Sequence, residues 1–282
     1  MIFETVKIKV KTPGASDFEP FLKCYIPDTS KEMPHYHKRP AVIICPGGGY
    51  EFRSFREDEP VALKYLANGI AAFVLEYSTG SDLYSSSSAR FPQQLCEACE
   101  AIKTVRDNAV KWDIDPHRVF IGGFSAGGHL ASSAVTMYGS KEVIENLGGD
   151  AEDYRPDGGI LCYPVISHNC DTHVGSFKAL LGEKYCDPEA RRYVSTETHI
   201  DKNTPPCFIW STSDDNAVPI INSLVFAEAL TANKVRYQLQ IYHSGQHGLA
   251  LCDRITSSVP SLKIDDYAEW INDSIKWIYK NF

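Results

Sequence analysis

The chain has 282 residues, 43% of them hydrophobic and 11% aromatic, which is enough to bury one large core in a single domain over 1–282. Acidic residues outnumber basic ones, 36 against 28, and the net charge of -8 comes with no basic cluster, which argues against nucleic acid as a partner. The longest apolar runs have the length of a strand, so no membrane partner is expected either.

The amino terminus and the cysteines both favour a cytoplasmic location. The first seven residues lack the basic and apolar regions of a secretory signal. The nine cysteines are odd in number and scattered, and several fall in expected buried strands. This pattern indicates free, buried thiols in a reducing compartment. Cys96 and Cys99 form a C-x-x-C inside an expected helix, where we interpret them as part of a packed face rather than as a redox centre.

Strands and helices are expected to alternate along the chain. The opening segments 4–11 and 21–26 alternate apolar and polar residues, as an antiparallel pair does. Buried strands are then expected at 41–45, 70–77, 119–122, 159–163, 207–210 and 237–242. Helices are expected at 59–68, 92–108, 126–138, 220–233 and 265–280. This alternation predicts an α/β fold whose central sheet is mostly parallel, with helices on both faces.

Two stretches interrupt this alternation. Residues 139–156 are polar and contain glycine, and a longer insertion at about 165–204 carries weak helical pieces such as 177–181. We expect the longer insertion to fold over the mouth of a site as a small cap. It contains His168, Cys170, Asp171 and His173, residue types that suit zinc. Polar loop residues near the mouth of a site also explain them, and we expect no metal.

The most informative motif is Gly123-Phe124-Ser125-Ala126-Gly127. It follows the apolar run 119–121 and precedes small residues that are expected to form a helix. A serine on a sharp turn between a strand and a helix is typical of a nucleophile elbow. Side chains two positions before and after the serine would collide in such a turn, so glycine is needed at both. The alternative is a glycine-rich turn in which the serine has no role.

A second glycine-rich segment, Cys45-Pro46-Gly47-Gly48-Gly49-Tyr50, follows the apolar run 41–44. Backbone N–H groups without side chains in the way can approach a developing oxyanion closely. We expect Gly48 and Gly49 to supply such donors, and the N–H of Ala126, directly after the serine, to supply another. A phosphate-binding loop is disfavoured because no G-K-[ST] follows the glycines.

An acid and a base follow two later strands. Asp214 and Asp215 come after the strand at 207–210, and His243 and His247 come after the strand at 237–242. The chain order is therefore serine, aspartate, histidine, each just beyond the carboxyl end of a strand, where sites form in open α/β sheets. We favour His247 as the base, because Gly248 follows it and frees the loop.

Together these motifs resemble the acetyl esterase/lipase group of α/β-hydrolases, and most closely its acetyl-xylan and feruloyl esterase-like sugar esterases. The similarity runs from about residue 39 to the C-terminus and includes 112–118 and 162–167. The resemblance implies the α/β-hydrolase fold and a serine esterase with no metal or organic cofactor. It favours Asp215, which stands four residues before Pro219, over Asp214 as the acid. We place substrate contacts at Tyr50.

The chain departs from the hormone-sensitive-lipase branch of this group at two places. Pro46 stands where that branch has histidine, and 76–80 lack its arginine-rich tyrosine motif. The segment from residue 76 to the serines at 85–88 is expected to border the acyl or alcohol pocket. Its polar character favours short acyl chains. His129, one turn past Ser125, is expected to pack under the loop, with a place in the pocket wall as the alternative.

We therefore predict a Ser125–His247–Asp215 esterase that removes short acyl groups, acetyl above all, from sugars or xylo-oligosaccharides. The expected partner is a small-molecule ester, an acylated sugar foremost, and a homodimer is the one protein assembly that we consider. Two alternatives remain open. One is an oligopeptidase-like serine hydrolase, although the large N-terminal domain of such enzymes is missing. The other is a non-catalytic binding protein with a hydrolase fold.

Overall fold

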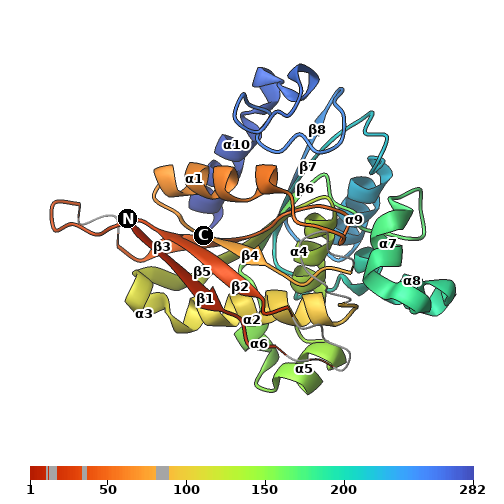
Figure 1. The fold of residues 1–282 in the computed structure, drawn as a ribbon, viewed down its shortest axis with the longest axis horizontal. Coiled ribbons are helices and arrows are strands. Elements are labelled where there is room, and N and C mark those ends of the chain that lie inside the picture. Colours follow the sequence, from red (N-terminus) through yellow and green to blue (C-terminus); the bar gives the residue numbers. More distant parts are fainter. Residues whose placement is uncertain (11, 13–17, 34–36, 81–88) are drawn as a thin grey trace.

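One sheet of eight strands forms the centre of the computed structural model, which describes residues 1–10, 12, 18–33, 37–80 and 89–282 (Figure 1). The strand order is β1-β2-β4-β3-β5-β6-β7-β8. The strands are β1 (Ile2–Lys7), β2 (Phe21–Ile26), β3 (Arg39–Cys45), β4 (Ala71–Glu76), β5 (Ile114–Phe124), β6 (Gly158–Cys162), β7 (Cys207–Thr212) and β8 (Tyr237–Tyr242). β2 pairs antiparallel with β1 and β4, and all other neighbours are parallel, which confirms the mostly parallel sheet.

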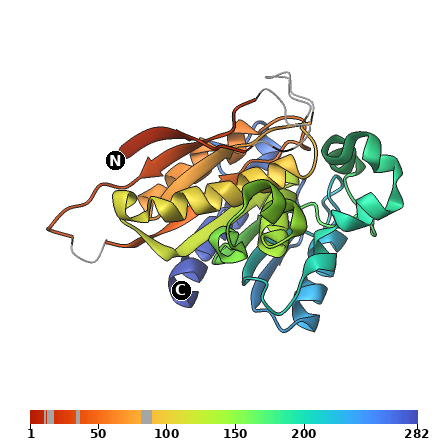
Figure 2. The ribbon, with the colours of Figure 1, turned by 90° about the horizontal axis from the view of Figure 1, so that it is seen from below.

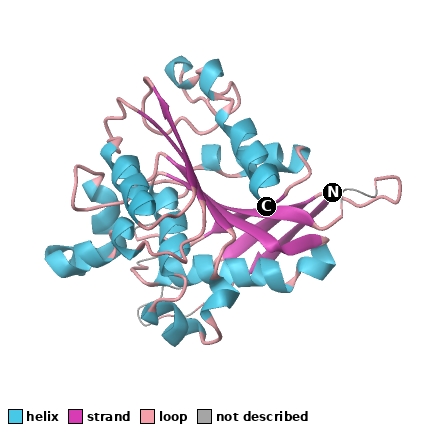
Figure 3. Cartoon of the chain, turned by 180° about the vertical axis from the view of Figure 1, so that it is seen from behind, coloured by secondary structure: helices cyan, strands magenta, loops and turns pink. Residues whose placement is uncertain are grey.

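Helices cover both faces of this sheet, and Figure 3 shows them on either side of the twisted strands. Successive side chains of a strand point to opposite faces, so Ile43 joins one core cluster and Ile44 the other. The first cluster contains side chains of α2 (Gln93–Asp107), α4 (Ala126–Met137) and α9 (Ile221–Ala232). The second contains side chains of α1 (Glu59–Ala67) and α10 (Trp270–Asn281). The central strands are therefore buried on both sides, which explains their continuous apolar runs.

Several element boundaries differ from the predicted ones. β5 begins at Ile114 rather than at residue 119, and it includes Pro116, which the apolar pattern had left outside the strand. The polar stretch 139–156 contains two short helices, α5 (Lys141–Leu147) and α6 (Ala151–Tyr154). Side chains of Ser140 and Asp150 accept hydrogen bonds from backbone N–H groups at their starts, so local capping forms these helices despite weak periodicity. α3 (Ala109–Trp112) follows α2 after a single residue, Asn108.

The insertion at about 165–204 contains more helix than its sequence suggested. It forms α7 (Val174–Leu181) and α8 (Pro188–Tyr193), with short 3₁₀ turns at Gly182–Cys186 and Thr196–His199. Figure 2 shows α7 and α8 gathered at one end of the molecule, far from the N-terminus. The division into one domain with a cap stays a prediction. None of the helices in the described ranges has the length and apolar character needed to span a membrane.

Candidate active site

Ser125 occupies a strained turn between β5 and α4. Its backbone has φ 55° and ψ -119°, a conformation that residues other than glycine rarely adopt. A Cβ added at Gly123 would lie 2.0 Å from the carbonyl oxygen of Gly127, and one at Gly127 would lie 2.1 Å from the carbonyl oxygen of Cys45. Both glycines are therefore required by close backbone packing, for the steric reason that the motif predicts.

Three side chains from the ends of three parallel strands meet at this turn. The Nε2 atom of His247 lies 2.7 Å from Ser125 Oγ, and its Nδ1 atom lies 2.6 Å from Asp215 Oδ2. The other oxygen of Asp215 accepts hydrogen bonds of 2.9 Å from the N–H groups of Ala217 and Val218. Since Asp215 is buried and acts as an acceptor, it favours the tautomer of His247 with the proton on Nδ1. Nε2 is then free to accept the proton of the serine hydroxyl.

The rival residues have other partners. Asp214 accepts a hydrogen bond of 2.6 Å from the N–H of Gly245 and so ties the end of β7 to the loop after β8. The Nδ1 atom of His243 lies 3.0 Å from the hydroxyl of Tyr267. His129 is fully buried between the Tyr50 hydroxyl and the carbonyl of Val194, and burial lowers its pKa to about 4. The structure thus brings Asp215 and His247, and not these neighbours, to Ser125.

The glycine loop after β3 lies beside the serine. Gly48 and Gly49 have φ values of 129° and 66°, and both line the same hollow as Ser125. Within the described parts of the chain, the N–H groups of Gly48 and Gly49 make no hydrogen bond. Ala126 is the first residue of α4, so its N–H has no partner within the helix. The three expected oxyanion donors are therefore close to the serine and not engaged in backbone pairing.

Comparison with known proteins identifies the family of this chain. The model of the BD-FAE family matches residues 22–230. The chain belongs to the BD-FAE family. It is 38% identical over 217 residues to endo-1,4-beta-xylanase B of Butyrivibrio fibrisolvens, covering 77% of this chain and 33% of the xylanase. It is 33% identical over 230 residues to the acetylxylan esterase of Xylanibacter ruminicola, covering 80% of this chain and 42% of the esterase. The chain thus spans less than half the length of either relative.

Solved structures similar to this BD-FAE chain cover nearly all of it. The acetyl ester-xyloside bifunctional hydrolase of Caldicellulosiruptor lactoaceticus aligns with a TM-score of 0.80 at 37% identity, over 98% of this chain and 96% of that one. MGS-M1, an alpha/beta hydrolase from a Medee basin deep-sea metagenome library, aligns with a TM-score of 0.75 at 33% identity, over 99% and 97%. These similarities confirm the α/β-hydrolase fold.

The hollow of this BD-FAE chain that contains Ser125 has a volume of about 350 Å³. Most of its lining comes from the glycine loop and the residues just after it, together with the serine and histidine loops. The lining residues are Gly48, Gly49, Glu51, Phe52, Ser54, Arg56, Glu57, Ser125, His173, Ala217, His247 and Gly248. Polar and charged side chains predominate, and Phe52 is the one large apolar side chain among them.

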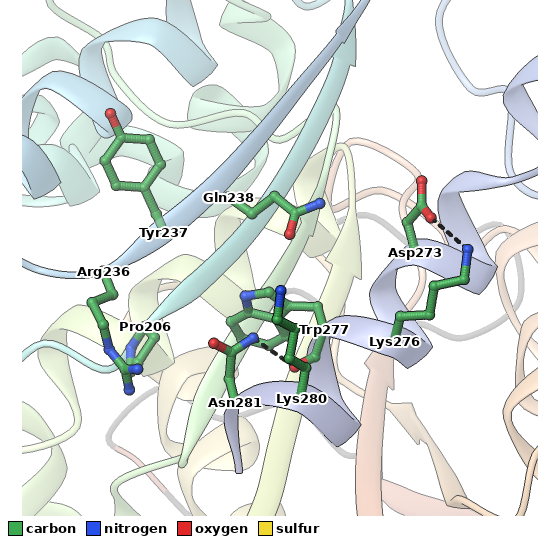
Figure 4. Close-up of a pocket in the computed structure, with 9 residues that line it drawn as sticks. All are labelled: Pro206, Arg236, Tyr237, Gln238, Asp273, Lys276, Trp277, Lys280 and Asn281. Carbon is green, nitrogen blue, oxygen red and sulfur yellow. Dashed lines mark hydrogen bonds and ion pairs between the residues drawn. The ribbon is translucent and has the colours of Figure 1, made fainter.

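A larger hollow, of about 550 Å³, lies elsewhere in the BD-FAE fold and is drawn in Figure 4. Its residues come from α10 and from the amino ends of β7 and β8, so it lies at the opposite end of these strands from Asp215 and His247. They are Pro206, Arg236, Tyr237, Gln238, Asp273, Lys276, Trp277, Lys280 and Asn281. With no serine, cysteine or histidine, this lining lacks a nucleophile and base of the kind at Ser125.

Tyr50 does not line the hollow, which corrects the substrate-binding role expected for it. Its backbone turns with φ 61° after the three glycines, and its side chain is 1% exposed. The hydroxyl bonds to Nδ1 of His129 at 2.8 Å, and the ring packs edge-on against Tyr77. Tyr50 thus supports the glycine loop from the core side.

Glu57 is a site residue that the sequence did not reveal. Its carboxylate is buried, and its two oxygens accept hydrogen bonds from the N–H of Gly47 at 2.8 Å and from the hydroxyl of Tyr163 at 2.7 Å. The Tyr163 hydroxyl in turn accepts the N–H of Ala250 at 2.8 Å, and its ring lies edge-on to the imidazole of His247. Glu57 therefore links the glycine loop to the loop that carries His247. It stands in a run of charged residues, which is typical of an exposed surface.

The candidate zinc residues of the insertion do not converge. Nε2 of His168 lies 3.1 Å from the Tyr185 hydroxyl, whereas Nδ1 of His173 bonds to Ser176. In the part of the chain that the structure describes, no three His, Cys, Asp or Glu side chains are placed to hold a metal ion. Of the segment expected to border the pocket, Ser78 is buried and bonds to Glu97, and residues 81–88 lie outside the described residues.

Proposed function

We propose that this chain is a serine carboxylic-ester hydrolase that removes short acyl groups, acetyl above all, from sugars or xylo-oligosaccharides. The observation that carries the proposal is the Ser125 hydroxyl, 2.7 Å from a histidine nitrogen that is oriented by a buried aspartate. Similarity to an acetylxylan esterase and to an acetyl ester-xyloside bifunctional hydrolase supports the choice of reaction and of substrate.

In the proposed reaction, Ser125 Oγ attacks the ester carbonyl while Nε2 of His247 takes its proton. Asp215 holds the imidazole in the required tautomer and stabilises the imidazolium that forms. The negative charge on the carbonyl oxygen is stabilised by the N–H groups of Gly48, Gly49 and Ala126. His247 then returns the proton to the departing alkoxide, leaving the acyl group on Ser125, and the same base activates the water that releases the acid.

The polar lining of the hollow supports a small acyl group and a sugar as the alcohol. Each methylene of an acyl chain gains about 0.8 kcal/mol only when it is buried against apolar surface. Arg56, Glu51 and His173 instead offer charges and hydrogen-bonding groups around the serine. Such groups match the hydroxyls of a sugar better than they match an alkyl chain.

The direct test compares Ser125→Ala with the wild type on acetylated xylo-oligosaccharides and on p-nitrophenyl acetate. We expect kcat to fall by roughly 10⁴ to 10⁶, because the serine and its partners act as one unit. Ser54→Ala is the matched control. Ser54 lines the same hollow, but among the described residues it is Ser125, and not Ser54, that hydrogen-bonds to His247. Activity of Ser125→Ala above about a tenth of the wild type would reject the mechanism.

A further inference from the structure

His173 is the one side chain that the insertion contributes to the described lining of the hollow. It caps the start of α7, and its ring lies next to the glycine loop, because a Cβ added at Gly49 would lie 3.7 Å from its Cε1 atom. The imidazole is half-buried and is close enough to His247 for that residue's charge to act on it. His173 therefore lies next to the glycine loop and lines the same hollow as the expected base, His247.

The hydrogen bonds of His173 determine which ring nitrogen carries the proton. The backbone N–H of Ser176 donates to Nδ1 at 3.2 Å, and the Ser176 hydroxyl lies 2.8 Å from the same atom. An amide N–H can only donate, so Nδ1 is an acceptor and carries no proton. Desolvation and the charge of His247 lower the pKa of His173, and the positive end of the α7 dipole also disfavours an imidazolium. The neutral ring then has its proton on Nε2.

The Nε2–H group of His173 has no hydrogen-bond partner among the described residues. It is thus a fixed donor on the wall of the hollow. The ester carbonyl oxygen does not need it, because backbone N–H groups are the donors expected for that oxygen. The leaving oxygen of an ester must come within hydrogen-bond reach of Nε2 of His247. The alcohol part of a bound ester therefore lies near His247, in the same hollow that His173 lines.

We propose that the Nε2–H of His173 donates a hydrogen bond to a hydroxyl or ring oxygen of the sugar that carries the acyl group. This makes His173 a specificity-determining residue, which selects esters of polyhydroxylated alcohols over esters of simple alcohols. The inference rests on the proposed ester hydrolysis and deepens it, because it assigns recognition of the alcohol to one side chain of the insertion.

Two substitutions separate the donor from the helix cap. In His173→Asn, the amide oxygen can replace Nδ1 as the acceptor for Ser176, since asparagine is a good N-cap, but the donor at Nε2 is lost. In His173→Gln, the amide nitrogen reaches the position of Nε2 and restores a donor. We expect His173→Asn to lower kcat/KM for acetylated xylo-oligosaccharides about 10-fold, through an unpaired sugar oxygen. Phenyl acetate, whose alcohol has no hydroxyl beyond the ester, should change less than about twofold. His173→Gln should recover most of the loss.

His168→Asn is the matched control, because His168 belongs to the same insertion but its Nε2 bonds to Tyr185. It should leave both substrates unaffected. An equal loss on both substrates in His173→Asn would overturn the proposal, since His173 would then act on the acyl reaction itself. So would a His173→Gln enzyme as impaired on the sugar ester as His173→Asn. A wild-type enzyme that cleaves phenyl acetate but no acetylated sugar would overturn the inference and leave ester hydrolysis standing, whereas inactivity on both esters would reject the proposed function as well.

Discussion

The strand ends and the insertion contribute to the same hollow but are built differently. Ser125 and Asp215 follow central parallel strands, and both are nearly buried. Their positions are fixed by the sheet and by backbone hydrogen bonds such as those from Ala217 and Val218 to Asp215. The insertion instead offers His173, half-buried at the start of an eight-residue helix. We infer that the sheet holds the reacting groups of the proposed reaction while the insertion selects the alcohol, so changes on the two sides should affect different kinetic quantities.

The largest effect outside Ser125 is expected from the acid. Asp215→Asn should lower kcat about 10⁴-fold, because an amide no longer enforces the tautomer of His247 with its proton on Nδ1. Asp214→Asn is the neighbouring control, and it should cost far less, since Asp214 bonds to Gly245 rather than to the imidazole. Steady-state kinetics with p-nitrophenyl acetate measures both. If Asp214→Asn proved the inactive enzyme, the assignment of the acid would be off by one residue.

A smaller effect is expected from the buried carboxylate behind the glycine loop. Glu57→Gln replaces one carboxylate oxygen by an NH₂ group, which then faces either the N–H of Gly47 or the hydroxyl of Tyr163. About one hydrogen bond is lost, so kcat should fall about 10-fold. KM should hardly change, because the glycine loop is proposed to act on the transition state rather than on the bound ester. Glu51→Gln removes a charge from the exposed rim of the same hollow and serves as the control. A rise in KM at constant kcat would contradict the role of Glu57 in placing the loop.

The polar lining predicts a modest dependence on acyl length. We expect kcat/KM to fall from acetyl to butyryl to octanoyl esters of p-nitrophenol, because Phe52 is the one large apolar side chain among the lining residues against which added methylenes could be buried. The series is measured at one pH with the wild-type enzyme. An increase of kcat/KM with chain length would indicate an apolar groove for the acyl chain. The preference for short acyl groups would then be wrong.

The last prediction concerns stability rather than turnover. Burial lowers the pKa of His129 to about 4, whereas an unfolded histidine titrates near about 6.5. Between these pH values the unfolded chain binds a proton that the folded chain does not, so the free energy of unfolding should fall as the pH drops, by about 3 kcal/mol in all. Urea unfolding at pH 7, 5.5 and 4 should show this loss in the wild type and a weaker one in His129→Gln. The control is His117→Gln, because His117 is exposed. If the stability of His129→Gln depended on pH as strongly as that of the wild type, His129 would not be the source of the loss.

The sequence was sufficient to predict those parts of the site that local rules control. The turn at Ser125 needs glycine two positions away on each side, and strand ends recur where apolar runs stop, so the serine, aspartate and histidine could be placed in order. The positions of α5 and α6 were missed because capping by Ser140 and Asp150, and not periodicity, defines those short helices.

Long-range contacts explain what the sequence left hidden. Glu57 gains its place in the site from a hydrogen bond to Tyr163, 106 residues away, and nothing near it in the chain marks it as buried. Substrate contacts were expected at Tyr50, but its side chain is buried in the core, where its hydroxyl bonds to His129. His173 was expected among polar residues near the mouth of a site, but its position beside Gly49 depends on how the insertion folds.

Labelling with a fluorophosphonate examines whether Ser125 is the nucleophile. The reagent forms a covalent bond preferentially with a serine that an adjacent base activates, so we expect one adduct, located by mass spectrometry on Ser125. Ser125→Ala should take up no label under the same conditions. An adduct on another residue, or undiminished labelling of Ser125→Ala, would show that Ser125 is not the nucleophile.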